Sequence, residues 1–152
     1  MLSNPFLYWM DKIYGFFIKI GSNLQSLFLL FMRITWGHQF LLTGIAKLKD
    51  IPGTTKLFTE LSIPSPLFHA YEVGLLETVG GILLVVGFAS RVISIPLIVL
   101  MLTALSVAHT EHLANFRFIT DPNILVAQAP YPFLITSLLV FVFGPGRVSL
   151  DA

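Results

Sequence analysis

The clearest pattern in the chain is a long apolar stretch that carries a basic, glycine-containing face. Residues 26–48 read SLFLLFMRITWGHQFLLTGIAKL, which is enough to cross a bilayer because a membrane helix needs about 20 mostly apolar residues. Spacings of 4, 3, 4 and 3 place five residues on one helix face: Arg33, Gly37, Phe40, Gly44 and Lys47. A basic, glycine-containing face inside an apolar helix requires a partner, which we expect the remaining chain to supply.

Three further apolar stretches predict membrane helices at about residues 67–89, 92–110 and 124–143. The connections between the stretches are short, which favours antiparallel neighbours. The first stretch ends at residues 47–53, KLKDIPG, where Pro52 and Gly53 stop a helix. The pattern therefore predicts an all-α protein, a transmembrane four-helix up-down bundle with both termini on one side.

The N-terminal residues show a different pattern. Lys12, Gly15, Lys19 and Ser22 recur at spacings of 3, 4 and 3, and aromatic and aliphatic residues cover the other faces. This pattern is typical of an amphipathic helix that lies in the membrane interface; the alternative is a loosely ordered tail packed on the bundle. We expect two parts, an interfacial segment at residues 1–25 and a bundle domain at residues 26–152.

Composition agrees with a membrane protein. The 152 residues are 55% hydrophobic and 11% charged, whereas soluble domains carry about 25% charged residues. A net charge of +1 gives no electrostatic case for a nucleic-acid partner. The chain has no cysteine, which excludes disulfides and thiolate metal sites.

Charged residues within apolar helices usually pair and face the bundle interior. Arg33 lies near the middle of its stretch and Glu77 near the middle of the next. At about 1.5 Å per residue the offset is within reach of an arginine, so we expect an intramembrane ion pair of Arg33 and Glu77. The pair either holds the bundle together or belongs to a site that handles protons or binds a ligand.

A second polar layer is expected nearer the loops that follow the first and third helices. It comprises Lys47, His69, Glu72, His109 and His112. Lys47 and Glu72 are a second candidate pair. The histidines with Glu72 are candidate ligands of a divalent metal, although histidines at an interface also serve as hydrogen-bonding residues.

Several residues around the first helix face are candidates for lining a ligand site. They are Trp36, Gly37, His38, Phe40 and Gly44. Trp36 and Phe40 either flank an aromatic ring or pack in the core. His38 lies at mid-membrane depth and is either a proton relay or a satisfied core residue. The chain contains no nucleophile triad, phosphate-binding loop or dinucleotide fingerprint.

Over about residues 27–151 the chain resembles the DoxX family of small bacterial membrane proteins. The resemblance rests on the face of the first helix, on Glu77 with residues 78–81, on Gly87 with Arg91, and on the ending GPGRVSLD (Gly144, Pro145, Gly146, Arg147 and residues 148–151). Family members often carry a histidine where this chain has Thr43. The extended aromatic N-terminus also looks unusual for the family.

The resemblance implies four transmembrane helices, the bacterial inner membrane and cytoplasmic termini, an orientation that charge alone leaves tied. It also implies a link to membrane redox or stress-response systems. Two hypotheses follow: a non-catalytic accessory protein, which includes a copper-stress role, or a quinone-binding subunit of a membrane oxidoreductase. Either would work beside a protein partner in the lipid bilayer, and the glycines of residues 67–89 also allow a homo-oligomer.

Overall fold

The computed structural model describes residues 5–108, 121 and 123–151. Its helices are α1 (Pro5–Lys49), α2 (Ile51–Glu60), α3 (Pro66–Val86), α4 (Ser90–Ala108), α7 (Asn123–Val126) and α8 (Pro130–Phe143). The described residues contain no strand, and α1, α3 and α4 are long and apolar enough to cross a membrane. The predicted all-α membrane bundle is therefore confirmed.

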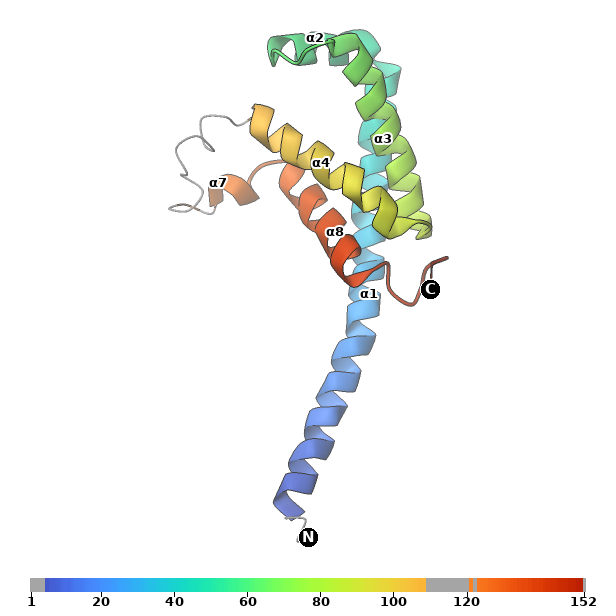
Figure 1. Ribbon diagram of the computed structural model, residues 1–152, viewed down its shortest axis with the longest axis vertical. Coiled ribbons are helices and arrows are strands. Elements are labelled where there is room, and N and C mark those ends of the chain that lie inside the picture. Colours follow the sequence, from blue (N-terminus) through green and yellow to red (C-terminus); the bar gives the residue numbers. More distant parts are fainter. Residues whose placement is uncertain (1–4, 109–120, 122, 152) are drawn as a thin grey trace.

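The helices form two pairs (Figure 1). α3 packs along α1, α8 packs along α4, and the second pair crosses the first at an incline. The short α2 lies across the far end of α1 and α3, while both ends of the described chain lie at the opposite end of the bundle.

The predicted fourth membrane helix is divided in two. Residues 124–143 form α7 and α8 with a break between them, and α8 alone has 14 residues. That length gives about 21 Å at 1.5 Å per residue, which is less than the hydrocarbon thickness of about 30 Å. Pro130 begins α8 and supplies no amide proton, so the preceding turn does not continue into it.

The N-terminal segment is not a separate helix, contrary to expectation. α1 runs without interruption for 45 residues, about 67 Å, because no proline follows Pro5 until Pro52. The side chains of residues 8–25 are exposed, and this part of α1 projects beyond the bundle (Figure 1). The placement of residues 1–25 at a membrane surface stays a prediction.

Glycines bring α1 and α3 close together. A Cβ at Gly44 would lie 2.5 Å from the Thr78 amide nitrogen, and one at Gly81 would lie 2.5 Å from the Leu41 nitrogen. Gly37 and Gly74 also face the opposite helix. Small residues allow such contact between membrane helices. The partner expected for the glycine-containing face of α1 is therefore α3. Gly74 and Gly81 of α3 pack against α1 of the same chain.

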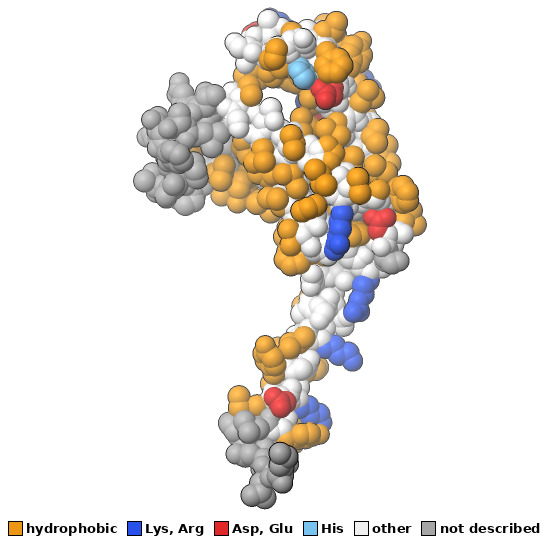
Figure 2. All heavy atoms as spheres, in the orientation of Figure 1, with side chains coloured by type: hydrophobic (Ala, Val, Ile, Leu, Met, Phe, Trp, Pro, Cys, Tyr) orange, Lys and Arg blue, Asp and Glu red, His pale blue; other side chains and the backbone are white. Residues whose placement is uncertain are grey.

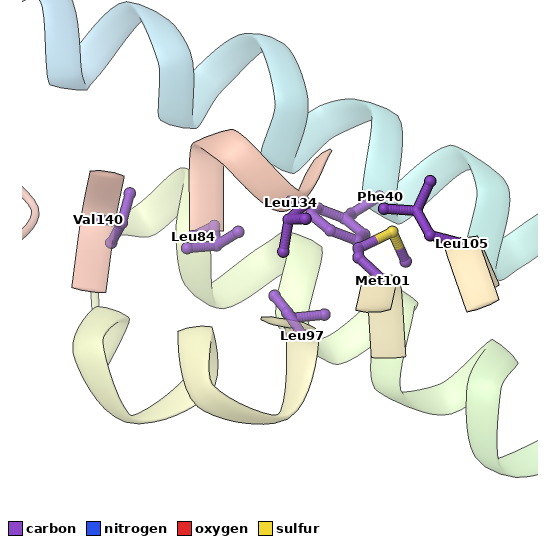
Figure 3. Close-up of a cluster of buried hydrophobic side chains, with 7 residues drawn as sticks. All are labelled: Phe40, Leu84, Leu97, Met101, Leu105, Leu134 and Val140. Carbon is purple, nitrogen blue, oxygen red and sulfur yellow. The ribbon is translucent and has the colours of Figure 1, made fainter. Parts of the chain in front are cut away.

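The core lies where the two helix pairs cross (Figure 3). It is formed by Phe40, Leu84, Leu97, Met101, Leu105, Leu134 and Val140, all at most 8% exposed. Phe40 enters this core from α1 and Leu84 enters from α3. The cluster joins all four of the longer helices, so the bundle has one continuous core.

The outer faces of the helices are also apolar. On α4, the exposed Val92, Ile95, Val99 and Leu102 recur at spacings of 3, 4 and 3, which is one face of a helix. Figure 2 shows hydrophobic side chains over the visible side of the bundle. Contiguous apolar faces of this extent are rare on soluble monomers, and they match a lipid environment.

Candidate functional site: a buried arginine and an intramembrane ion pair

Arg33 is the most buried charged residue among those described, with 1% of its surface exposed. Its Nε donates to the Leu84 carbonyl at 2.8 Å, and its Nη2 donates to the Val85 carbonyl at 3.2 Å. Its Nη1 donates to the carbonyls of Pro145 at 2.5 Å and Val148 at 3.1 Å. The guanidinium thus joins the last turn of α3 to the segment that follows α8.

The chain makes room for this guanidinium with Gly87. This residue ends α3 with φ of 77°, and the space that a Cβ would occupy is filled by the Arg33 guanidinium. A positive φ favours glycine, and the contact excludes a side chain there. Glycine is therefore required at position 87 for two reasons: its φ is positive, and the Arg33 guanidinium occupies the space of a side chain.

Asp151 closes the same end of the bundle. Its two carboxylate oxygens accept hydrogen bonds from the Ala89 amide at 2.9 Å and the Ser90 amide at 2.8 Å. Its own amide donates to the Gly87 carbonyl at 3.0 Å. The amide hydrogen bonds of Ser90 and Ala89, aided by the charge of Arg33, lower the pKa of Asp151. Asp151 therefore caps the first turn of α4 from the far end of the sequence.

The expected Arg33–Glu77 pair does not form, which corrects the sequence prediction. Glu77 accepts from Lys47 Nζ at 2.5 Å. Gly44 lies against Thr78, so Glu77 faces α1 about 11 residues, or roughly 16 Å, from Arg33. The prediction aligned the two helix centres, whereas packing shifts the register of α1 and α3. Glu77 is 4% exposed, whereas the Lys47 side chain is 27% exposed, so the pair is buried on its acid side and partly open on its basic side.

The second polar layer also differs from expectation. Glu72 does not pair with Lys47; instead its Oε2 lies 2.8 Å from His69 Nδ1, one turn earlier on α3. His109 and His112 lie outside the described residues. Within residues 5–108, 121 and 123–151, no group of three metal-ligating side chains is found, and the metal site stays a prediction.

The residues predicted to line a ligand site do not lie around one common space in the structure. Phe40 is fully buried, and Trp36 and Phe40 both contact Phe133 edge-on, with ring centroids 5.2 and 4.6 Å away. Gly37 and Gly44 pack against α3. His38 is exposed on the outer face of α1. The aromatic residues form a cluster between α1 and α8, and their role in ligand binding stays a prediction.

The C-terminal motif (residues 144–151) follows α8 and lies against Arg33. Gly144 lies against the Arg91 guanidinium, Pro145 accepts from Arg33, and Arg147 Nη1 donates to Asn23 Oδ1 at 3.3 Å. Sequence reasoning missed Asp151 as a helix cap and Phe133 as an aromatic partner. For Asp151, the available sequence signal was an acidic residue in the C-terminal motif GPGRVSLD. For Phe133, the sequence offered no signal beyond its position in an apolar stretch.

These features define a small helical membrane protein in which one buried arginine holds the C-terminal segment against the bundle. The family model described as DoxX matches residues 28–110. The chain belongs to the DoxX family.

Two relatives match most of the chain. "Putative oxidoreductase CatD" of Bacillus subtilis (strain 168) is 28% identical over 122 residues, which cover 80% of this chain and 83% of the relative. "Inner membrane protein YphA" of Escherichia coli (strain K12) is 26% identical over 127 residues, which cover 84% and 90%. No solved structure gives a significant match to the chain.

Proposed function

We propose that the protein is a non-catalytic accessory subunit of a membrane redox or stress-response system. It resides in the bacterial inner membrane, with its termini in the cytoplasm, and works beside a protein partner. The relative named as an inner membrane protein supports the location. The relative whose name contains "oxidoreductase" supports the redox connection.

The observation that carries the non-catalytic role is the use made of the intramembrane charges. Arg33 donates to four main-chain carbonyls, and Glu77 pairs with Lys47 across the α1–α3 contact. Groups committed to such contacts hold helices in register. They are poor candidates for proton transfer, which needs a group free to bind and release a proton.

The Lys47–Glu77 pair provides the test. Glu77→Leu alone leaves a half-buried lysine without its acid, and we expect it to lower the amount of folded protein in the membrane. The double variant Lys47→Met, Glu77→Leu removes both charges, and we expect recovery of abundance and of the protein partners that copurify in mild detergent, because buried ion pairs are often replaceable by apolar residues.

The activity of the complex that copurifies with the double variant decides whether the ion pair is structural or functional. If the double variant is as abundant as the parent but no longer supports the activity of the copurifying complex, the pair is functional and the accessory role with a structural pair is wrong. The surface exchange Lys49→Gln, at an exposed position near Lys47, is the control for charge removal.

A quinone-binding subunit is the second candidate. The aromatic cluster of Trp36, Phe40 and Phe133 favours it, because aromatic and apolar side chains are common in ligand sites. Mass spectrometry of the purified protein is expected to detect stoichiometric quinone under this candidate, and Trp36→Leu is expected to release it. Absence of quinone from stable, monodisperse protein counts against it.

A further inference from the structure

A crevice opens at the end of the bundle where the C-terminus lies. Its volume is about 760 Å³, and its walls come from α1, the start of α4 and the segment after α8. α3 ends at Val86 and α4 begins at Ser90 on this side, so the crevice lies where the membrane helices end. That is the depth at which lipid headgroups are found.

Two arginines line the crevice. The Arg91 guanidinium lies against Gly144, with Nη2 3.0 Å from where a Cβ would be, and Arg147 contacts Asn23 through Nη1. The ion pairs among the described residues include neither arginine. The guanidinium groups therefore have hydrogen-bond donors to offer to a ligand, and arginine binds phosphate with paired donors.

One acid also lines the crevice, and its charge is already engaged. Asp151 accepts from two amides at the start of α4, and the nearby charge of Arg33 offsets its own. The ionisable side chains in the lining are then two arginines and one aspartate, which leaves a net charge of +1. The crevice is suited to an anion.

The remaining wall is apolar and continues onto the lipid-facing surface. Leu29, Val92 and Phe143 contribute to it. Val92 is 69% exposed and begins the outer apolar face of α4 that continues through Ile95 and Val99. A ligand with both a phosphate and a hydrocarbon chain matches the two kinds of wall, whereas a free phosphate would leave the apolar wall unused.

We propose that this crevice binds an anionic phospholipid. Arg91 and Arg147 hold the phosphate, and an acyl chain lies along the outer face of α4. Figure 2 shows further basic side chains along the projecting part of α1, where the sequence has Lys12 and Lys19. These lysines add attraction to a negatively charged membrane surface, and the two arginines add a defined site.

Native mass spectrometry of the delipidated full chain, titrated with phosphatidylglycerol or phosphatidylcholine, tests the proposal. We expect one phosphatidylglycerol to bind more tightly than phosphatidylcholine. Arg91→Gln with Arg147→Gln is expected to weaken phosphatidylglycerol binding about 30-fold, or about 2 kcal/mol, because each basic residue near an anionic surface contributes about 1 kcal/mol.

A matched control distinguishes a lipid site in the crevice from general electrostatic attraction between basic residues and anionic lipid. Lys12→Gln with Lys19→Gln removes the same charge from the same end of the molecule but outside the crevice, and we expect less than about threefold weakening. Equal losses in both double variants, or no loss in the arginine variant, would overturn the proposal. If the glutamine pair fails to fold, the pair Arg91→Lys with Arg147→Lys is used; it keeps the charge, loses the paired donors and is expected to bind phosphatidylglycerol more weakly than the parent.

Inorganic phosphate distinguishes the two sources of the anion. Added at millimolar concentration, it is expected not to displace phosphatidylglycerol. Displacement of the lipid by phosphate, with binding unaffected by acyl chain length, would assign the crevice to a soluble phosphate and overturn the lipid proposal.

Discussion

Arg33 carries a full charge within a membrane helix, and carbonyl dipoles surround it. Four carbonyls from two distant parts of the chain accept its hydrogen bonds. Planar geometry lets one guanidinium reach all of them, which the single ammonium of lysine cannot do. At this position the identity of the cation matters as much as its charge.

We therefore expect Arg33→Lys to destabilise the protein although the charge is kept. Loss of two or three charge-assisted hydrogen bonds, with carbonyls left unsatisfied, is expected to cost about 3 kcal/mol. Thermal unfolding in detergent measures the loss, and limited proteolysis should show cleavage near Val148. Lys49→Arg, an exchange of the same two residue types at an exposed site, is the control and is expected to change neither.

Asp151 makes stability depend on pH. Because amide hydrogen bonds lower its pKa in the folded protein, its contribution is complete above the unfolded value of about 3.9 and is lost as pH falls through the lowered value. Asp151→Asn is expected to lower the melting temperature at neutral pH and to flatten the fall at acidic pH. Asp11→Asn, on the projecting part of α1, is expected to keep the parent profile; identical curves for all three chains would contradict this role.

At the scale of elements, α1 and α3 are held at a distance that only glycine permits. Backbone atoms of α3 lie where a Gly44 side chain would be, and backbone atoms of α1 lie where a Gly81 side chain would be. The register set by this contact decides which polar groups meet. It brings Glu77 to Lys47 and leaves Arg33 beside the end of α3.

Gly44→Ala is consequently expected to destabilise the bundle by about 1–3 kcal/mol, because a methyl group there overpacks the contact. Gly21→Ala adds the same methyl group to the same helix where nothing lies within 4 Å. That control is expected to be neutral or to gain up to about 1 kcal/mol of helix propensity. Equal melting temperatures for the two variants would show that the close contact is absent.

At the scale of the whole molecule, the projecting part of α1 is the unusual feature. Its exposed residues include Tyr8, Trp9, Tyr14, Phe16 and Phe17. Aromatic residues accompanied by lysines are typical of the membrane interface. A surface of this kind is not expected to remain in water.

Trp9 can report on this surface because the chain has only two tryptophans. In a Trp36→Phe background, Trp9 is expected to emit at short wavelength in liposomes and to be quenched by lipids brominated near the headgroup. Quenching by aqueous acrylamide alone, with no effect of brominated lipid, would contradict an interfacial location. A chain lacking residues 1–20 is expected to keep the melting temperature of the bundle, since contacts such as Arg147–Asn23 lie beyond the cut.

The sequence by itself determined the class of protein and most of its long helices. Three of the four predicted apolar stretches form long apolar helices, the glycine-containing face of α1 required a close partner, and Pro52 marked the end of the first helix. These properties follow from local spacing and from the requirement that apolar side chains meet lipid or each other. The pattern did not show that residues 5–25 continue into the first helix or that the fourth stretch breaks before Pro130.

Only the tertiary structure decided the pairing of the polar groups. Whether Glu77 meets Arg33 or Lys47 depends on the sliding of α1 against α3, which glycine packing fixes and spacing within either helix does not show. The meeting of Arg33 with Pro145 and Val148, and of Asp151 with the start of α4, joins residues more than 60 positions apart. Such contacts depend on the complete arrangement of helices, because each partner is a main-chain group that every residue possesses.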